Sequence, residues 1–483
     1  MEKLPNEVKN TLGTLQGKGF QAFVVGGCVR DILIKRTPED WDIATNATPE
    51  EIQKLFPQNF YENKFFTVTI QTESSDPTLQ DIEITTFRSD AKYGDRRHPE
   101  KVEYAKTIEE DLSRRDFTMN AIALTLKGDL IDPFEGQKDL KKKIIRAVGI
   151  PEERFQEDAL RMMRAVRFSA TLGFGLEKDT LKAIQENAAL LKEISQERIR
   201  DELVKILMAP RAVEGLETLR ETGLLQYILP ELLEGYGVTQ NKHHIYTVWE
   251  HNLYSLQYAV KMNWPLDVRL ASFLHDIAKP RVKQGEGADS TFYGHEVVGT
   301  KVTSQILSRL KFSNKDIEKV ATLVRYHMFY YNVDEVSDAS VRRLVRNVGV
   351  EYVEDLLKLR MADRIGSGVP KAEPYKLRHF RYLLEKVALD PLSPKMLQIN
   401  GNDLMKLGDI PAGPAIGQVL DVLLSEILED PAKNTKKYLE PRVKELLLLK
   451  KEELEKLSVK ARHDREQVET RRDEMTKQKY WVT

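Results

Sequence analysis

The stretch AFVVGGCVRDILIKRTPEDWDIAT, residues 22–45, decides the fold of the N-terminal part of the chain. An apolar run is followed by two glycines and by a second apolar run with helical spacing, which predicts a strand, a tight turn and a helix. Asp40 and Asp42 come next, with the i, i+2 spacing that places two side chains on one face of a strand. The stretch therefore predicts a strand that presents two carboxylates beside a glycine turn.

Working outward from this stretch, short apolar runs bounded by Gly, Asp and Pro predict further strands. They are FTVTIQT at 66–72, DIEITTF at 81–87, NAIALTL at 120–126 and DLIDPF at 129–134. After Arg146 the apolar residues recur with the 3.6-residue period of helices. We therefore expect an α+β protein with a mixed-sheet head over 1–145, a helical neck over 146–235, a helical domain over 236–390, and a helical body with a charged tail over 391–483.

The glycine turn and the acidic residues together predict a site for phosphates and metal ions. Glycines let a ligand approach the backbone closely, and Arg30 can bind phosphate oxygens. Asp81 and Glu83 again share one face of a predicted strand. Carboxylates on one face repel one another unless a cation lies between them. Their hard oxygen atoms suit Mg²⁺. Two such ions are the arrangement that nucleotidyl transfer needs. The alternative for the two aspartates alone is simple exposure on an edge strand.

Composition limits the class of protein. The chain has 483 residues, 41% hydrophobic and 31% charged, which is enough for several packed domains. Its 74 basic and 75 acidic residues nearly cancel, so any basic surface is local. The single cysteine, Cys28, excludes a disulfide framework and is expected to be a small buried side chain. Without a signal peptide or a long apolar run, the sequence predicts a cytoplasmic protein that does not bind membranes.

Five motifs resemble, in order and spacing, the class II tRNA nucleotidyltransferases, which comprise CCA-adding enzymes and bacterial poly(A) polymerases. They are GGCVRD at 26–31, DWD at 40–42, EDLSRRDFTMNAIA at 110–123, DPFEGQKDL at 132–140 and EDALRMMRAVRF at 157–168. The resemblance covers about the first 230 residues. It implies a polymerase-β-like head, CTP and ATP as substrates, and tRNA as partner.

The same resemblance implies roles for individual residues. Asp40 and Asp42 would hold Mg²⁺, with Glu83 as the third catalytic carboxylate. The implied nucleotide-binding residues are Gly26, Gly27, Arg30, Arg114, Arg115, Asp116, Asn120, Asp158, Arg161, Arg164 and Arg167.

The last motif is also informative by itself. If EDALRMMRAVRF is one helix, Asp158 and Arg161 are i, i+3 neighbours, and an acceptor beside a planar donor can imitate a Watson–Crick edge. A solvated helix pair is the alternative reading of these two residues. By the resemblance they form the protein template that selects CTP and ATP, with Arg164 and Arg167 near the phosphates or base.

Histidines are concentrated in the central segment. His275 and Asp276 lie in the apolar run LASFLHDIAK, where a buried imidazole and carboxylate need a compensating partner such as a metal ion. The motifs around the histidines resemble the HD superfamily of metal-dependent phosphohydrolases. That implies one metal site of His251, His275, Asp276 and Asp363, and a possible second at His295 and His327. Mixed imidazole and carboxylate ligands suit Ni²⁺, Mn²⁺ or Co²⁺. Satisfied core histidines and a metal site without turnover are the alternatives.

Several reactions remain open at this point. NKFFTVTI at 63–70 resembles the K-F-G-T-V strand of CCA-adding enzymes, with Phe66 where glycine is usual, and AKYGDRRHPEKV at 91–102 resembles a loop that CC-only enzymes lack. The NKFFTVTI segment favours CCA addition over poly(A) synthesis. The loop, which the resemblance links to the switch from C to A addition, argues against a CC-only enzyme and leaves A-only addition possible. An RNA-binding HD phosphohydrolase with a silent head is the alternative from another class. Predicted RNA contacts are KKKIIR at 141–146, VRRLVR at 341–346 and the charged tail, in a monomer or homodimer.

Overall fold

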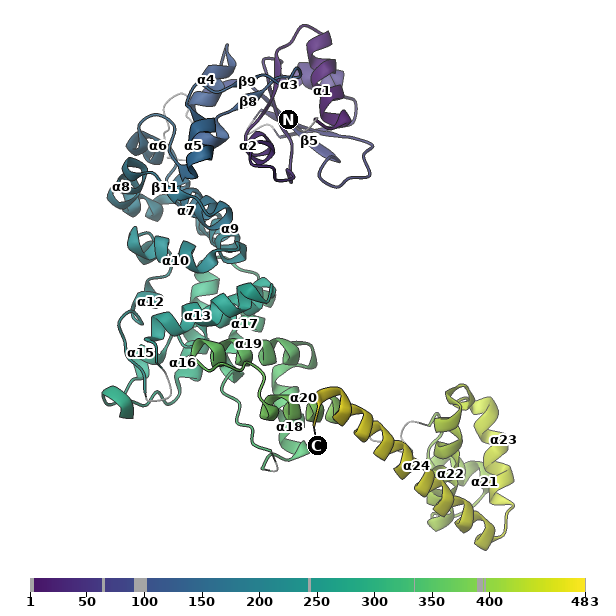
Figure 1. The fold of residues 1–483 in the computed structure, drawn as a ribbon. Helices are drawn as coiled ribbons and strands as arrows, with labels where there is room; N and C mark the ends of the chain where they lie inside the picture. The colour runs from purple at the N-terminus through teal and green to yellow at the C-terminus, as the bar shows by residue number, and fades with distance from the viewer. Residues whose placement is uncertain are drawn as a thin grey trace. The chain divides into compact units, whose positions relative to one another are not determined.

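The computed structural model describes residues 4–62, 66–90, 102–241, 245–333, 335–388, 394 and 397–482. Contacts divide the chain into two compact units (Figure 1). The first unit comprises Met1–His327 and Lys358–Pro370, and the second comprises Met328–Leu357 and Lys371–Thr483. Both candidate centres lie within the first unit.

The head is built on a seven-stranded mixed sheet, as the sequence predicts. The strand order is β3 (Asn59–Glu62), β4 (Thr67–Gln71), β5 (Asp81–Thr86), β2 (Asp42–Thr45), β1 (Ala22–Val25), β8 (Ala123–Leu124) and β9 (Leu130–Ile131). Strands β2 and β5 are parallel, whereas the other neighbouring pairs are antiparallel. The five apolar runs expected to form strands do so. The buried residues alternate along β5, so one of its faces supports the core while Asp81 and Glu83 stay exposed on the other.

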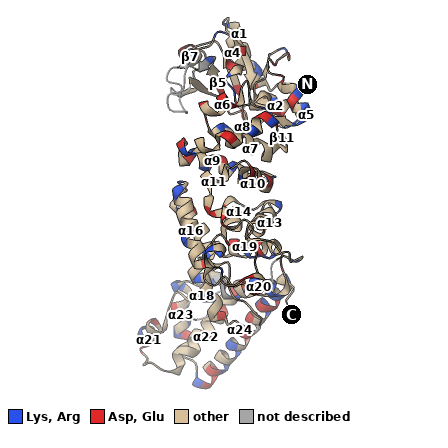
Figure 2. Cartoon of the chain, turned by 90° about the vertical axis from the view of Figure 1, so that its left-hand side faces the viewer, with Lys and Arg blue, Asp and Glu red and all other residues tan. Residues whose placement is uncertain are grey.

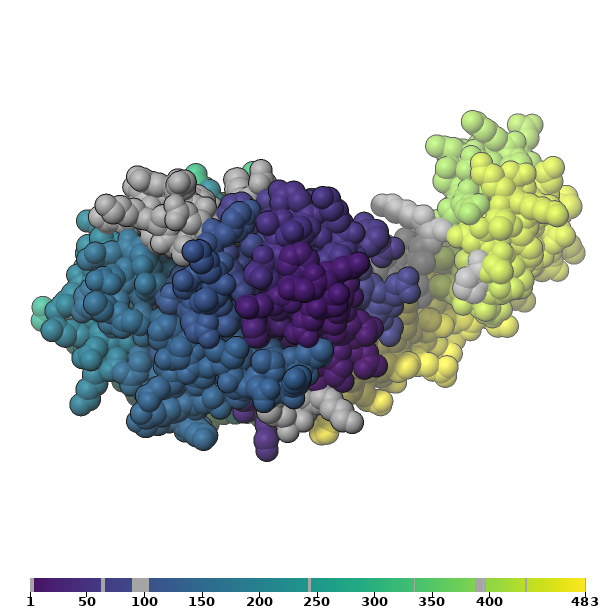
Figure 3. Space-filling view, turned by 90° about the horizontal axis from the view of Figure 1, so that it is seen from above, coloured from purple at the N-terminus to yellow at the C-terminus, as the bar shows by residue number. Residues whose placement is uncertain are grey.

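Short helices complete the head. They are α1 (Asn6–Gly17), α2 (Gly27–Leu33), α3 (Pro49–Leu55), α4 (Ile108–Ser113) and α5 (Gly136–Lys142), with the small strands β6 (Arg88–Asp90) and β7 (Val102–Tyr104) paired apart from the main sheet. The space-filling view in Figure 3 shows purple residues of the N-terminal segment on the surface of the head, beside blue residues from later in the same unit. Cys28 is fully buried in α2, as expected.

Helices follow the head in the same unit. The neck contains α6 (Pro151–Glu157), α7 (Leu160–Leu172), α8 (Lys178–Asn187), α9 (Gln196–Met208) and α10 (Ala212–Glu221). One expectation is wrong here, because EDALRMMRAVRF is not a single helix. The backbone of Asp158 is extended, with φ −147° and ψ 103°, and its carboxylate accepts a hydrogen bond from the Leu160 N–H at 3.1 Å. Asp158 is the C-cap of α6 and Ala159 is the N-cap of α7, so the local turn that the Asp158 carboxylate makes with the backbone lies between two helices.

The histidine-bearing helices form the rest of the first unit, together with the short α15 (Lys279–Val282). They are α13 (Val248–Lys261), α14 (Leu266–Leu274), α16 (His295–Arg309), α17 (Asn314–Tyr326) and the later part of α19 (Val353–Gly366). The residues of α14 from Val268 onward are buried, as the apolar run predicts, but the helix ends at Leu274 and His275 is its C-cap. His275 and Asp276 therefore lie at the end of a buried helix.

The second unit is helical in its described residues. Its helices are α18 (Asp338–Val348), α20 (Tyr375–Ala388), α21 (Gly401–Gly408), α22 (Pro414–Glu429), α23 (Lys436–Leu447) and α24 (Lys451–Tyr480). The charged tail is the continuous helix α24, along which basic and acidic residues alternate (Figure 2). It packs against α22 and α20. Among the described helices, none is long and apolar enough to cross a membrane.

Candidate functional site

The two aspartates of the DWD motif both face the glycine turn. Strand β2 begins at Asp42, so Asp40 precedes the strand and is not part of it as the i, i+2 argument assumed. The two carboxylates nevertheless converge. A Cβ added to Gly26 would lie 3.1 Å from Asp42 Oδ2, and one added to Gly27 would lie 3.9 Å from Asp40 Oδ1. Gly26 also has φ +81°, which favours glycine, so the turn leaves room for the acids.

Glu83 lies beside Asp42 because β2 and β5 are parallel and these two residues are in register. Burial and the charge of Asp40 raise the pKa of Asp42 to about 7, with a further contribution from Glu83, and Arg115 only partly offsets this. Carboxylates that disfavour one another's charge in this way fit a divalent cation, which would relieve the repulsion. Asp40, Asp42 and Glu83 are therefore the residues that would hold Mg²⁺.

Two arginines of the RRD motif are held by a carboxylate that the sequence analysis did not single out. Asp111 is buried and accepts hydrogen bonds from Arg114 Nε at 3.0 Å and from Arg115 Nη2 at 3.4 Å. A Cβ on Gly26 would lie only 2.9 Å from Arg115 Nη1. Asp111 thus directs the Arg115 guanidinium toward the glycine turn and Asp42.

Asp116 and its partners connect the head to the neck. Its Oδ1 accepts from the side chain of Asn120 at 3.0 Å, and its Oδ2 accepts from Arg164 Nε at 2.8 Å. Burial alone would raise the pKa of Asp116, but the Arg164 charge and these hydrogen bonds lower it to about 2. Asn120 in turn accepts from Arg30 Nη1 at 2.9 Å. One network therefore joins four of the predicted nucleotide-binding residues.

Asp158 and Arg161 are not paired with each other. Asp158 Oδ2 accepts from Arg198 Nη2 of α9 at 2.7 Å, while Arg161 Nη1 donates to Glu157 at 2.5 Å and its Nη2 donates to the Arg114 carbonyl oxygen at 3.1 Å. The two side chains thus have different partners, while the Arg161 backbone N–H donates to the Asp158 carbonyl oxygen at 3.0 Å. Sequence spacing gave no signal for Arg198, because it lies 40 residues from Asp158.

Arg167 has a similar long-range partner. It donates to Glu202 of α9 at 3.2 Å, and Glu202 is buried. Helix α9 thus supplies one charged partner to Asp158 and another to Arg167, and neither was predicted from the sequence.

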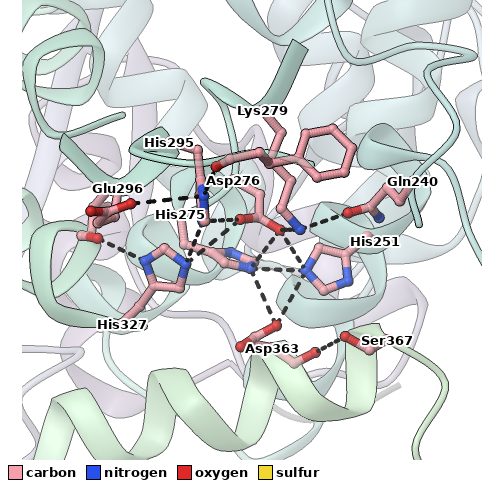
Figure 4. Close-up of polar contacts among 12 residues, drawn as sticks. Gln240, His251, His275, Asp276, Lys279, His295, Glu296, His327, Asp363 and Ser367 are labelled. Carbon is pink, nitrogen blue, oxygen red and sulfur yellow. Dashed lines mark hydrogen bonds and ion pairs between the residues drawn. The ribbon is translucent and has the colours of Figure 1, made fainter. Parts of the chain in front are cut away.

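Six predicted metal ligands of the central segment come together in one buried cluster (Figure 4). His251 Nε2 lies 2.9 Å from His275 Nε2 and 3.0 Å from Asp276 Oδ2. On the other side, Asp276 Oδ1 lies 3.3 Å from His295 Nε2 and 3.6 Å from His327 Nε2. Asp276 therefore lies between two histidine pairs.

Asp363 completes the cluster from α19. Its Oδ1 lies 3.5 Å from His251 Nε2 and 3.8 Å from His275 Nε2. The ligand atoms of these three residues lie within 4.8 Å of one another, and so do those of His275, Asp276 and His327. The donor set fits a transition metal, and the cluster offers two overlapping groups of ligands.

Backbone contacts fix which ring nitrogen of each histidine faces the cluster. The Nδ1 atoms of His275, His295 and His327 lie 3.0, 2.7 and 2.7 Å from backbone carbonyl oxygens, which can only accept. Each neutral ring therefore carries its proton on Nδ1 and turns the lone pair of Nε2 inward, as metal-bound histidines do. Core histidines without a metal would not need several Nε2 atoms to face one another, so this geometry argues against that alternative.

Cations balance the buried carboxylates. Lys279 Nζ lies 2.6 Å from Asp276 Oδ2 and donates to Gln240 at the same distance, and Arg360 donates to Asp363 at 2.7 Å. Burial would raise the pKa of Asp276, but Lys279 and the histidines hold it well below its ordinary value. Burial lowers the pKa of His251 and His327. For His295 burial acts in the same direction, but Asp276 outweighs it and raises the pKa.

Two sequence features bear on the choice of reaction. Phe66 has φ 51°, a left-handed conformation that explains why glycine is usual at that position of the K-F-G-T-V pattern. Residues 63–65, and residues 91–101 of the loop predicted over 91–102, lie outside the described residues.

Three parts of the chain match known domain families. Residues 22–146 match the Poly A polymerase head domain, residues 173–235 match an RNA and SrmB-binding site of polymerase A, and residues 296–443 match domain 2 of tRNA nucleotidyltransferases.

Relatives extend the similarity over most of the chain. The CCA-adding enzyme of Geobacillus kaustophilus is 34% identical over 426 residues, covering 87% of this chain and 92% of its own. The A-adding tRNA nucleotidyltransferase of Deinococcus radiodurans is 40% identical over 331 residues, covering 65% and 74%. The crystal structure of the Bacillus stearothermophilus CCA-adding enzyme with CTP has a TM-score of 0.58 and 29% identity, covering 91% of this chain and 96% of that one.

Proposed function

Because this chain belongs to the tRNA nucleotidyltransferase family that includes the CCA-adding enzymes, we propose that it adds C, C and A to the 3′ end of tRNA from CTP and ATP. The chain is a nucleotidyltransferase. The observation that carries the proposal is the convergence of Asp40, Asp42 and Glu83 on the glycine turn, beside arginines that can bind a triphosphate. Full CCA addition is favoured over A-only addition because the CCA-adding enzyme of Geobacillus kaustophilus aligns over 87% of this chain, whereas the A-adding enzyme of Deinococcus radiodurans aligns over 65%.

The residues of the head have separable tasks in this reaction. Asp40, Asp42 and Glu83 would hold Mg²⁺, and the bound ion would supply positive charge for the triphosphate and for the tRNA 3′ hydroxyl. Arg30 and Arg115 bind the triphosphate, and the glycine turn lets it approach the backbone. Asp116 orients Arg164 and contacts the ribose of the incoming nucleotide.

Nucleobase selection is assigned to Asp158 and Arg161. In the structure each side chain has another partner, Arg198 for Asp158 and Glu157 for Arg161. The base edge would replace these partners when CTP or ATP enters. An acceptor and a planar donor then face the base, which is the chemistry needed to recognise C or A.

The assay of this proposal uses purified protein, Mg²⁺ and tRNA transcripts that lack CCA, CA or only the final A. CTP, ATP or both are supplied, and the 3′ ends are sequenced. We expect all three transcripts to be completed to CCA. Growth only of the transcript that lacks the final A would identify an A-adding enzyme, and long A tails would identify a poly(A) polymerase. No incorporation would leave the histidine and aspartate cluster around Asp276 as the remaining candidate for an active centre.

A second function is favoured by the inward-facing Nε2 atoms. We propose that His251, His275, Asp276 and Asp363, with His295 and His327, hold Ni²⁺, Mn²⁺ or Co²⁺ and that this HD centre hydrolyses phosphate esters or 2′,3′-cyclic phosphates at RNA ends. Incubation with 2′,3′-cyclic AMP and each metal tests it. Hydrolysis that a chelator abolishes is expected, whereas a metal-loaded protein without turnover would make the centre structural.

RNA contacts, assembly and location remain predictions. The Lys141–Lys143 run is exposed, as are Arg342, Arg343 and Arg346 of α18. We propose these basic surfaces as contacts to the tRNA backbone, which a steep salt dependence of binding would reveal. The chain is expected to be a cytoplasmic monomer or homodimer.

A further inference from the structure

Phe168 of α7 lies among three arginines of the nucleotide site. Its ring centroid is 4.4 Å from the guanidinium carbon of Arg167, 5.2 Å from that of Arg30 and 5.7 Å from that of Arg164. Arg30 comes from α2 in the head, whereas the other two come from α7 in the neck. Phe168 is 8% exposed, so these contacts are largely shielded from water.

Each of the three guanidiniums is also held by its own carboxylate. Arg30 donates to both oxygens of Asp31 at 3.0 and 2.9 Å, and Arg164 and Arg167 pair with Asp116 and Glu202. Like charges around one ring repel one another, and the carboxylates and the negative potential of the ring faces oppose that repulsion. The aromatic ring is the element that all three arginines share.

The ring also touches the RRD motif. Phe117 meets Phe168 edge to face, with centroids 5.8 Å apart. The N–H of Phe117 donates to Asp116 at 2.8 Å, and Asp116 is the partner of Arg164. Phe168, which lies on α7, thus contacts Arg30 of α2 and Phe117 next to the RRD motif.

We propose that Phe168 is a positioning residue for nucleotide selection, whose ring fixes Arg30, Arg164 and Arg167 relative to one another. This inference rests on the proposed nucleotidyl transfer. When the spacing of the three arginines is fixed, the position of the triphosphate in the head also fixes where the base of the same nucleotide lies in the neck. A looser arrangement would let incorrect bases reach the same phosphate position.

The ring electrons, and not the ring volume, carry this role. Replacing Phe168 with phenylalanines that carry one, two or three fluorine atoms nearly preserves its shape while weakening the negative potential of the ring face. We expect the KM for CTP and for ATP to rise stepwise with fluorination, by about ten-fold at three fluorines. The preference for CTP over UTP should fall in parallel, while kcat changes less.

Conventional variants check the same point. Phe168→Leu should raise the KM values and lower the preference for CTP over UTP as much as the trifluorinated residue does. Phe168→Tyr should keep the wild-type preference. Phe87→Leu is the control, because Phe87 is a fully buried phenylalanine of the head core whose ring stacks on Phe23 at 6.2 Å. It should lose stability without losing selectivity.

The outcomes separate this inference from the proposed function. A wild-type protein that incorporates no nucleotide would overturn nucleotidyl transfer itself. An active wild type whose KM and CTP preference stay flat across the fluorinated series would overturn the role of Phe168 alone. A fall in kcat with unchanged KM and selectivity would also overturn it, since positioning of the nucleotide predicts the opposite split.

Discussion

The carboxylate cluster of the head and the proposed HD centre both bring carboxylates together, but the charges that balance these carboxylates differ. In the head, Asp40 and Glu83 are exposed, and only Arg115 lowers the raised pKa of Asp42. In the HD centre, Asp276 and Asp363 are buried and are held ionised by Lys279, Arg360 and the histidines. The oxygen ligands of the head would suit a hard cation such as Mg²⁺, whereas the mixed nitrogen and oxygen donors of the histidine cluster would suit a transition metal.

The largest effect should come from removing the central carboxylate of the head. In Asp42→Asn we expect nucleotide incorporation to fall by about a thousandfold or more, because the charge that holds Mg²⁺ is lost. Metal binding at the HD centre should not change. Asp81→Asn is the matched control, since Asp81 shares the exposed face of β5 with Glu83 but lies outside the cluster. Loss of both activities in a folded Asp42→Asn protein would refute the separation of the two centres.

The reverse change targets Asp276. Asp276→Asn should lower the affinity for Ni²⁺ or Mn²⁺ by about a hundredfold and leave nucleotide incorporation intact. It should also cost about 3–5 kcal/mol of unfolding free energy, because it leaves the Lys279 ammonium buried without its carboxylate. The double variant with Lys279→Met should recover part of that loss. Calorimetric titration and denaturant unfolding measure the two effects, and unchanged metal affinity would remove Asp276 from the site.

The acidic groups of the head also make Mg²⁺ binding depend on pH. Since the pKa of Asp42 is about 7, Mg²⁺ must displace a proton at lower pH, and the Mg²⁺ concentration for half-maximal activity should rise about tenfold one unit below that pKa. An Mg²⁺ requirement that is flat between pH 6 and pH 8 would contradict the raised pKa.

The raised pKa of Asp42 also predicts how the unfolding free energy depends on pH. The folded state keeps a proton on Asp42 that the unfolded chain, with a pKa of 3.8, releases. The unfolding free energy of the metal-free protein should therefore fall as pH rises from about 4 to about 7. The difference between wild type and Asp42→Asn, measured by urea unfolding at several pH values, isolates this contribution from other groups. Excess Mg²⁺ should reverse the loss above pH 7.

The smallest effect concerns the partner of the base-selecting aspartate. Arg198→Met should change the preference for CTP over UTP by about two- to five-fold, because a partly exposed ion pair contributes little. Arg200→Met on the same helix is the control, since Arg200 pairs with the exposed Asp201. An effect as large as that of Asp158→Ala would mean that Arg198 contacts the nucleotide itself.

The sequence predicted the parts of both centres that follow from local patterns. Alternating apolar runs located the strands, and β2 and β5 bring together the carboxylates that the motifs had singled out. His275 and Asp276 are predicted because a buried imidazole and carboxylate in an apolar segment need a partner, whereas His251, His295, His327 and Asp363 follow from the resemblance to the HD superfamily. Short-range sequence patterns do not predict pairs such as Asp158 with Arg198, because these pairs depend on how α9 packs against α7.

One error was avoidable from the sequence. Asp158 was placed inside a helix, although aspartate often caps a helix by accepting a backbone N–H. The structure divides the motif between α6, of which Asp158 is the C-cap, and α7, which begins at Leu160. Lys279 was also missed, because a lysine at the end of an apolar run is usually exposed and here it is buried against Asp276.

The most direct test of the two-centre account is anomalous diffraction from crystals grown with Mn²⁺ and CTP. We predict one manganese peak beside Asp40 and Asp42 in contact with the CTP phosphates, and a separate peak among His251, His275 and Asp276 that persists without CTP. Bound CTP with no manganese at the two head aspartates would contradict the account.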